Sequence, residues 1–277
     1  MSDNIQITTF DSKVAFKFGA VFLDLWQGLK MWRVWLALSW QEFKATYRRS
    51  LLGVLWVLGS FAGYVFVKLI IFSSLIPVAD ATSYNAFLTI GLYVWIYLVM
   101  VVSSGPVTFV SAGGWIRSEA IPLSLYAFKH IMRELYNFGL TLFVVIAALV
   151  YIEFLPKAQS AYAIFAVLFY VVNAIWIKVF FGILGARFRD VGHLVRAITL
   201  PMMFLTPVFW LPEQMSELMN YLWWNPFYHY LEIFRAPIVD GIFPVASWTY
   251  VLILFVVGWI ASIILFARFS RRIVFWL

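Results

Sequence analysis

Six long runs of apolar residues, separated by shorter stretches that hold most of the charged residues, dominate the pattern along the chain. A bilayer hydrocarbon core of about 30 Å is crossed by about 20 consecutive apolar residues in a helix. The pattern therefore predicts spans at about 51–76, 85–110, 136–155, 161–186, 197–211 and 246–267. The fifth is short and carries Pro201 and Pro207. We expect an all-α integral membrane protein with one transmembrane domain, residues 25–277, after a tail of residues 1–24.

Residues 25–50 have the pattern of an amphipathic helix. Apolar residues recur at steps of three and four and share one narrow stripe, formed by Leu25, Leu29, Trp32, Leu36, Trp40, Phe43 and Tyr47. One flank is polar and mostly basic, with Lys30, Arg33, Gln41, Lys44 and Arg48. A basic, tryptophan-rich helix of this kind is typical of a segment lying in the headgroup plane. The alternative, a half-buried helix of a soluble domain, is disfavoured by the apolar run that follows.

Residues 212–245 are too apolar for an ordinary solvated loop and are broken by Asn225-Pro226. We expect two short re-entrant helices here, between the fifth and sixth spans, because irregular backbone at membrane depth must be satisfied within the protein. Trp223, Trp224 and Tyr228 lie at the joint. An interfacial aromatic belt and a pore mouth remain equally open interpretations of these rings.

The composition agrees with a membrane protein, since 64% of the 277 residues are hydrophobic, 12% are charged, and mean hydropathy is +0.91. The absence of cysteine excludes a disulfide framework and thiolate metal sites. The first 20 residues lack the basic and apolar regions of a cleavable signal peptide, so we expect a partly mobile cytoplasmic tail.

The placement of Lys and Arg predicts the orientation. All but four of the 20 lie in the N-terminal region, the loops after the second and fourth spans, or the C-terminal tail. Both termini are therefore expected in the cytoplasm, and the net charge of +7 does not indicate nucleic acid. Lys68 and Lys178 fall within spans, where reaching toward the nearer headgroups is favoured over a functional role. Apart from Glu153, near the end of the third, the expected spans contain no acidic residue.

The chain lacks the motifs of several catalytic classes. No G-x-x-x-x-G-K-[ST] loop for ATP and no H-E-x-x-H is present. His130, His193 and His229 are dispersed, so no metal site is expected. Glu213 and Glu217 look like solvated helix charges. These absences favour transport over catalysis.

Two cytoplasmic loops, 111–135 and 187–196, are more structured than bare connections, and they either cap helix ends or form a docking surface for a soluble partner. Aromatic residues in and beside the spans, among them Trp56, Tyr64, Phe209 and Trp210, could stack on sugar rings, although for any single one of them core packing is favoured.

Three motifs in order are similar to those of one transporter family. The run Tyr47–Trp56, YRRSLLGVLW, resembles the start of the first span in polysaccharide-exporting permeases of the type-2 ABC family, which serve O-antigen, capsule and teichoic acid. Arg189-Asp190 followed by LTPVFW at 205–210 resembles the second motif, and Asn225-Pro226 with Phe234-Arg235 the third. Thr206 stands where serine is more usual, and no proline follows Trp56 shortly after, which leaves the subfamily open.

The resemblance implies a homodimeric permease in the bacterial inner membrane, working with two copies of a separate ATPase that binds ATP and Mg. This chain would hold no cofactor, and its substrate would be a lipid-linked polysaccharide. The implied ATPase-coupling residues are Arg117, Ser118, Glu119, Pro122, Arg189, Asp190 and His193. From the amphipathic pattern, the candidate interfacial residues at the cytoplasmic mouth are Trp32, Arg33, Trp40, Lys44, Tyr47, Arg48 and Arg49. Their basic flank would face headgroups, the ATPase or the anionic end of the substrate. The implied channel or gate aromatics are Trp56, Tyr64, Phe209, Trp210, Trp223, Trp224 and Tyr228. Export of a drug or small lipid, and a membrane-embedded glycan enzyme, are the alternatives.

Overall fold

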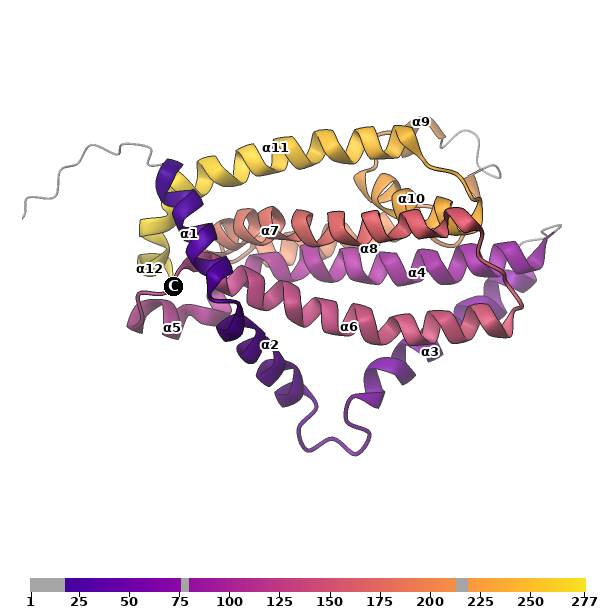
Figure 1. Cartoon of the computed structure of the whole chain (residues 1–277), viewed down its shortest axis with the longest axis horizontal. Coiled ribbons are helices and arrows are strands. Elements are labelled where there is room, and N and C mark those ends of the chain that lie inside the picture. Colours follow the sequence, from indigo (N-terminus) through magenta and orange to yellow (C-terminus); the bar gives the residue numbers. More distant parts are fainter. Residues whose placement is uncertain (1–17, 76–79, 213–218) are drawn as a thin grey trace, which may run out of the picture.

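The computed structural model describes residues 18–75, 80–212 and 219–277, and within those ranges the chain is helical and contains no strand. Five helices are long and apolar enough to cross a membrane (Figure 1). They are α3 (Leu55–Leu75), α4 (Ala81–Ser104), α6 (Leu123–Tyr151), α7 (Ala163–Arg187) and α11 (Val245–Phe269). The expectation of an all-α integral membrane protein is confirmed at this level.

The expected fifth span has a different form. Helix α8 (Val191–Leu205) has 15 residues, about 22 Å of helix, which is less than the hydrocarbon core of about 30 Å. It starts earlier than the expected 197–211 and accommodates Pro201. The helix ends before Pro207, because a residue preceding proline is disfavoured in the helical region and Thr206 is extended.

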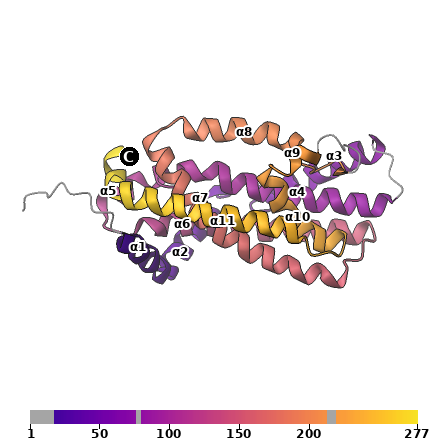
Figure 2. The same cartoon turned by 90° about the horizontal axis from the view of Figure 1, so that it is seen from above.

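Helix α4 forms the centre of the bundle. In its most apolar window 72% of the residues are buried, against 11–33% in the other four long helices. It contacts α3, α6, α7, α8 and α10 (Pro226–Val239), and it lies among them in Figures 1 and 2. The hydrophobic core is therefore built around α4, while the other long helices keep apolar faces for lipid.

The amphipathic segment differs from its prediction. Instead of one helix over 25–50, α1 (Phe18–Lys30) and α2 (Trp32–Thr46) follow each other with a break at Met31. The helix begins within the expected tail of 1–24, because Phe18 to Val21 already have helical apolar spacing. Residues 1–17 of that tail lie outside the described part. Beyond α2 the chain turns and enters α3, so that α2 and α3 diverge on either side of the turn (Figure 1).

The third span also begins earlier than predicted. Helix α6 starts at Leu123, 13 residues before the expected 136, because Lys129, Arg133 and Glu134 had the appearance of a loop. The preceding connection contains η1 (Gly105–Val107), η2 (Val110–Ala112) and α5 (Gly113–Ser118), so Gly113-Gly114 belongs to a helix. The remaining long helices match the expected 85–110, 161–186 and 246–267 to within a few residues, apart from the earlier end of α4.

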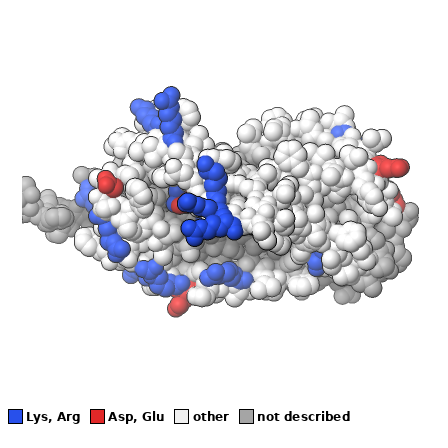
Figure 3. Space-filling model, turned by 90° about the horizontal axis from the view of Figure 1, so that it is seen from below, with Lys and Arg blue, Asp and Glu red and all other residues white. Residues whose placement is uncertain are grey.

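The two ends of the bundle differ in the short helices that they hold and in their surface charge. Helices α1, α5 and α12 (Ile273–Trp276) lie at one end, and α9 (Met219–Leu222) and α10 at the other (Figure 1). On the face in Figure 3, Lys and Arg gather over the half that holds α1 and α2, and the other half shows only a few of them and an acidic patch at its edge. Part of the expected segment 212–245, residues 213–218, is outside the described ranges.

Candidate functional site

The irregular segment after α8 is held by α10. Asn225 caps α10 by accepting from Phe227 N at 3.0 Å. Its Nδ2 donates to the Thr206 hydroxyl at 2.9 Å and to the Leu205 carbonyl at 3.2 Å. The threonine that replaces the usual serine therefore supplies the same hydroxyl. The second and third sequence motifs thus meet in space.

Arg235 fixes the same segment from the far side of α10. It is 1% exposed, and its Nη1 donates to the Pro207 carbonyl at 2.6 Å. Its guanidinium pairs with Glu232, one turn earlier, and lies 3.6 Å from the ring centroid of Phe87 on α4. The sequence analysis did not include Glu232 and Phe87, although an acid three residues before a buried arginine is a readable signal. One side chain therefore joins α4, α10 and the end of α8.

The structure separates the predicted gate aromatics into two groups. Phe209 and Trp210 are buried: the Phe209 carbonyl accepts from Tyr84 Oη at 2.6 Å, and Trp210 Nε1 donates to the Phe204 carbonyl at 3.0 Å. Trp223 and Trp224 are 51% and 77% exposed, whereas Tyr228 is half-buried. Core packing accounts for the first pair, whereas Trp223 and Trp224 present their rings to the outside.

Lys68 lies among aromatic rings of two elements. Its Nζ is 5.3–5.6 Å from the ring centroids of Tyr64, Phe72 and Phe209, a geometry of cation–π attraction. Tyr64 Oη also donates to Met203 Sδ of α8 at 3.6 Å. These contacts attach α3 to α8 and to the irregular segment that follows it.

An aromatic crevice of about 520 Å³ opens beside the start of α3. Its walls come from α3, α4, α6 and the end of α2, and they comprise Tyr47, Trp56, Val57, Ser60, Phe61, Tyr64, Ile96, Met100, Asn137 and Thr141. Burial raises the pKa of the Tyr47 phenol, opposed in part by the charge of Arg133, so the phenol stays neutral and can donate a hydrogen bond. The crevice brings together three residues from two of the predicted groups, Tyr47, Trp56 and Tyr64.

Helix α2 keeps its basic side chains and two of its three tryptophans on the outside, whereas Trp35 packs against Phe128 of α6. Trp32 and Trp40 are 50% and 47% exposed, and Arg33 and Lys44 lie 5.3 and 5.6 Å from their ring centroids. Arg48 and Arg49 are exposed in the turn toward α3. The inner face of α2 is fixed to α6 through Glu42, which pairs with Lys129 at 2.5 Å. The expected single stripe is thus divided, with Phe43 buried and Trp32 outside.

Asp24 of α1 caps the first turn of α6. Its carboxylate accepts from Leu123 N and Ser124 N, each at 2.9 Å, and the Ser124 hydroxyl donates to the Asp24 carbonyl at 2.8 Å. Helix α1 approaches so closely that a Cβ at Gly28 would collide with Ser124. The sequence analysis assigned Asp24 to the tail, because a cap supplied about 100 residues away leaves no local signal.

Removing this cap should loosen α1 from the bundle. Asp24→Ala exposes two helix-start N–H groups and should lower the free energy of unfolding by about 1–2 kcal/mol. Asp24→Asn retains one acceptor and should give an intermediate loss. Thermal unfolding of the purified variants measures both, and equal stability of all three proteins would contradict the capping role.

The predicted coupling residues lie at the basic end of the bundle. Arg117, Ser118 and Glu119 are exposed at the end of α5, and Pro122 is half-buried before α6. The second loop exposes Arg189, Asp190 and His193. Helix α12 contacts α5 and α7, and Arg189 Nη2 donates to the Trp276 carbonyl at 3.3 Å. The two loops are therefore connected through α12, which the sequence analysis left out.

Two expectations about charges within the spans are wrong. Lys178 is fully buried and pairs with Glu134 of α6 at 2.5 Å, so it does not reach toward headgroups. Its Nζ also donates to Ser104 Oγ at 2.5 Å and to the Val101 carbonyl at 2.9 Å. Glu134 is 1% exposed and lies within α6, so this span carries a buried carboxylate that the expected bounds of 136–155 left out. The early start of α6 explains the error.

The geometry joins the three motifs into one frame around α4. A comparison with known families agrees with the motifs, because the model of the ABC-2 type transporter family matches residues 33–239, from the start of α2 to the end of α10. The chain belongs to the ABC-2 type transporter family. Its resemblance to this family, first seen in the motifs, is confirmed.

Two curated relatives of this ABC-2 chain are O-antigen export system permease proteins RfbA from Klebsiella pneumoniae. They are 24% and 22% identical over 236 residues, which cover 83% of this chain and 88% of each relative. An ABC-2 permease is the membrane subunit of a transporter and not itself an enzyme, and its family membership implies an ATPase partner. The chain is accordingly a multi-pass membrane protein.

The histidines and carboxylates of the ABC-2 chain are spread over several elements. Within 18–75, 80–212 and 219–277, no three His, Cys, Asp or Glu side chains group in a way that could hold an ion. His130 Nε2 lies 3.1 Å from Ser111 Oγ, and the two ring nitrogens of His229 lie 3.0 Å from the Ser247 hydroxyl and the Trp223 carbonyl. These two imidazoles hold helices together.

Proposed function

We propose that this ABC-2 permease exports a lipid-linked polysaccharide, O-antigen or capsule, across the bacterial inner membrane. The observation that carries the proposal is the similarity to two O-antigen export permeases over 83% of the chain. The exposed aromatic residues support it, because aromatic faces bind the apolar C–H faces of sugar rings without requiring one linkage.

The proposed topology has six crossings with both termini in the cytoplasm. Helix α8 and the irregular residues 206–210 together form the fifth crossing, and α9 and α10 re-enter from the outer side as gate helices. The gathering of Lys and Arg at the end that holds α1, α5 and α12 supports this orientation. The buried contacts of Asn225 and Arg235 give the short fifth crossing the polar partners that lipid cannot supply.

The proposed assembly is a homodimer with two copies of a separate ATPase. ATP and Mg bind to the ATPase, and no cofactor binds to this chain. The exposed loop residues around Glu119 and Arg189 form the docking surface, with α12 between them to couple both loops. Motion of the ATPase then reaches α6 through Pro122 and α8 through the loop at Asp190.

The aromatic crevice is the proposed site of first contact with the substrate. It lies where α2 and α3 diverge, beside Arg48 and Arg49. These arginines provide positive charge for a lipid phosphate, while Trp56 and Tyr64 provide rings for the adjoining sugar. The substrate then passes outward along a channel between the two protomers.

Deleting the gene in its host tests the proposal. We expect surface polysaccharide to disappear and undecorated polymer to accumulate inside the cell, with recovery on complementation by the intact gene. Normal surface polysaccharide in the deletion strain would refute the proposal. Loss of a drug or small-lipid efflux activity in that strain would identify the alternative cargo.

Charge reversal tests the docking surface. Glu119→Lys and Arg189→Glu should each lower ATPase co-purification and transport several-fold, because exposed complementary charges steer association. Glu153→Lys, exposed at the opposite end of the bundle after α6, is the matched control and should leave both readouts unchanged. If both loop variants bind ATPase and transport normally, the loops only cap helices.

A further inference from the structure

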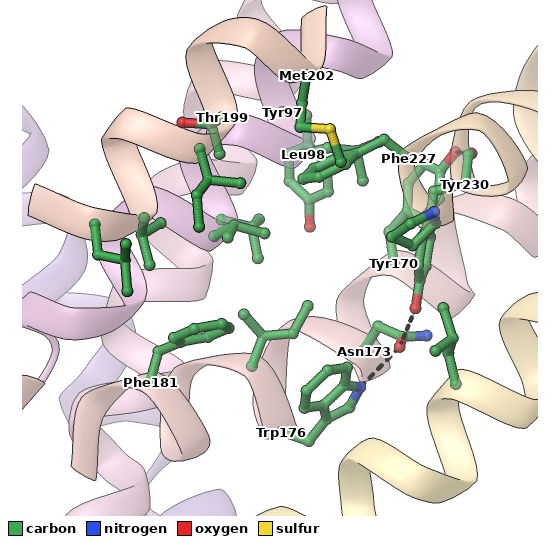
Figure 4. Close-up of a pocket in the computed structure, with 18 of the residues that line it drawn as sticks. Tyr97, Leu98, Tyr170, Asn173, Trp176, Phe181, Thr199, Met202, Phe227 and Tyr230 are labelled. Carbon is green, nitrogen blue, oxygen red and sulfur yellow. Dashed lines mark hydrogen bonds between the residues drawn. The ribbon is translucent and has the colours of Figure 1, made fainter. Parts of the chain in front are cut away.

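An elongated apolar cavity of about 510 Å³ lies between α8 and the helices α4, α7 and α10 (Figure 4). Its walls come from α4, α7, α8, α10 and one residue of α11. On α7 the lining residues run from Tyr170 to Leu184, about 21 Å along the helix axis. The volume is typical of a small-molecule site. Its length and its walls match a hydrocarbon chain lying parallel to the helices.

Most polar side-chain atoms in the wall already form hydrogen bonds within the protein. Asn173 Oδ1 accepts from Trp176 Nε1 at 2.8 Å and from Tyr230 Oη at 2.7 Å (Figure 4). Thr199 Oγ1 donates to a carbonyl of its own helix. The Tyr97 hydroxyl points into the cavity and has no partner within the described ranges. A buried water needs two to four polar partners, so this wall suits hydrocarbon better than water.

The cavity is open toward the membrane along α8. Leu194 and Ile198 line it and are nevertheless 58% and 49% exposed. The helices around them, α4, α7 and α11, are long and apolar enough to span a bilayer. What surrounds an opening between such helices is the hydrocarbon of the bilayer, so an acyl chain can enter from the side.

One end of the cavity adjoins a basic loop. The lining residues Leu184, Val191 and Val195 come just before and after the turn between α7 and α8. Around this turn three arginines are exposed, Arg187 at the end of α7, Arg189 in the turn and Arg196 in the second turn of α8, against the single acid Asp190. Arginine binds phosphate oxygens strongly, and a cluster of basic side chains at the end of a membrane helix favours an anionic headgroup.

From the cavity and the arginines together we propose that the chain binds one anionic membrane phospholipid. One acyl chain fills the cavity between α8 and the helices α4 and α7, and the phosphate contacts the arginines of the α7–α8 turn. The lipid supports the short helix α8 where protein contacts are lacking. This site is separate from the aromatic crevice, and its test requires no transport.

Native mass spectrometry of the full chain, purified after reconstitution in vesicles of phosphatidylglycerol and phosphatidylcholine in equal amounts, tests the site. We expect one retained phosphatidylglycerol per chain. Val195→Phe on α8 and Leu98→Phe on α4 fill the cavity from opposite walls, and each should lower retention roughly tenfold. Val256→Phe is the matched control, because Val256 is 54% exposed on α11 and lies outside the cavity wall. Unchanged retention in both cavity variants would overturn the proposal.

Arg196→Gln tests the headgroup without changing the cavity. It should remove the preference for phosphatidylglycerol over phosphatidylcholine while an acyl chain is still retained. Equal retention of both lipids by the wild-type chain would contradict an anionic site. Retention of the exported lipid-linked polymer in place of phospholipid, in protein purified from its host membrane, would also overturn the proposal.

Discussion

Lys178→Met alone should destabilise the protein by about 3–5 kcal/mol, because it leaves the carboxylate of Glu134 buried without its cation. Glu134 is 1% exposed, and one of its oxygens already has no partner within the described ranges. The variant should therefore unfold at a much lower denaturant concentration in mixed micelles, and accumulate poorly in the membrane. Glu134→Gln should be less damaging, since the amide still accepts from Lys178.

The double variant Lys178→Met with Glu134→Leu separates charge balance from packing. Buried ion pairs replaced together by apolar residues are often neutral or stabilising. We expect the double variant to recover most of the stability lost in Lys178→Met. If it is as unstable as the single variant, Ser104 and the surrounding packing determine the stability, and the ion pair does not.

Arg235→Lys should abolish export while leaving the protein in the membrane. Lysine keeps the charge but loses the planar fork that contacts both Glu232 and the Pro207 carbonyl. The irregular segment after α8 then loses buried hydrogen bonds to a charged group, which costs about 3 kcal/mol. Surface polysaccharide measured in the complemented deletion strain reports the effect.

Glu232→Gln is the matched control for this variant. It keeps an acceptor beside Arg235 and leaves the bond to Pro207 intact, so export should fall only in part. Wild-type export by Arg235→Lys would show that the position of α10 does not depend on the fork. Loss of Arg235→Lys protein from the membrane would instead assign Arg235 to folding.

Hydropathy predicted the long helices well because each span is a local property of about 20 residues. It failed at α6, where Lys129, Arg133 and Glu134 interrupt the apolar run although the helix is continuous. Their partners come from other helices: Lys129 binds Glu42, and Glu134 binds Lys178. Such pairing lowers the cost of burying a charge, and a single sequence does not reveal it.

Only part of the candidate site was predicted, because local motifs can be read from a sequence whereas contacts between distant segments cannot. Motif order identified Asn225 and Arg235, and the structure brings both to the segment after α8. Exposure of the loop residues around Glu119 and Arg189 was also predicted from their charge. The aromatic residues were harder, since Trp210 in the core and Trp224 outside have the same side chain, and only their neighbours decide between packing and contact.

The central position of α4 has a consequence for biogenesis. Synthesis proceeds from the N-terminus, so α4 leaves the ribosome when only α1, α2 and α3 precede it. The helices that bury it later, α6, α7, α8 and α10, are not yet made. During that interval the Tyr93 hydroxyl lacks the Phe138 carbonyl of α6 to which it donates in the folded protein at 3.1 Å. We therefore expect α4 to leave its site of insertion only after α6 has been made and can pack against it.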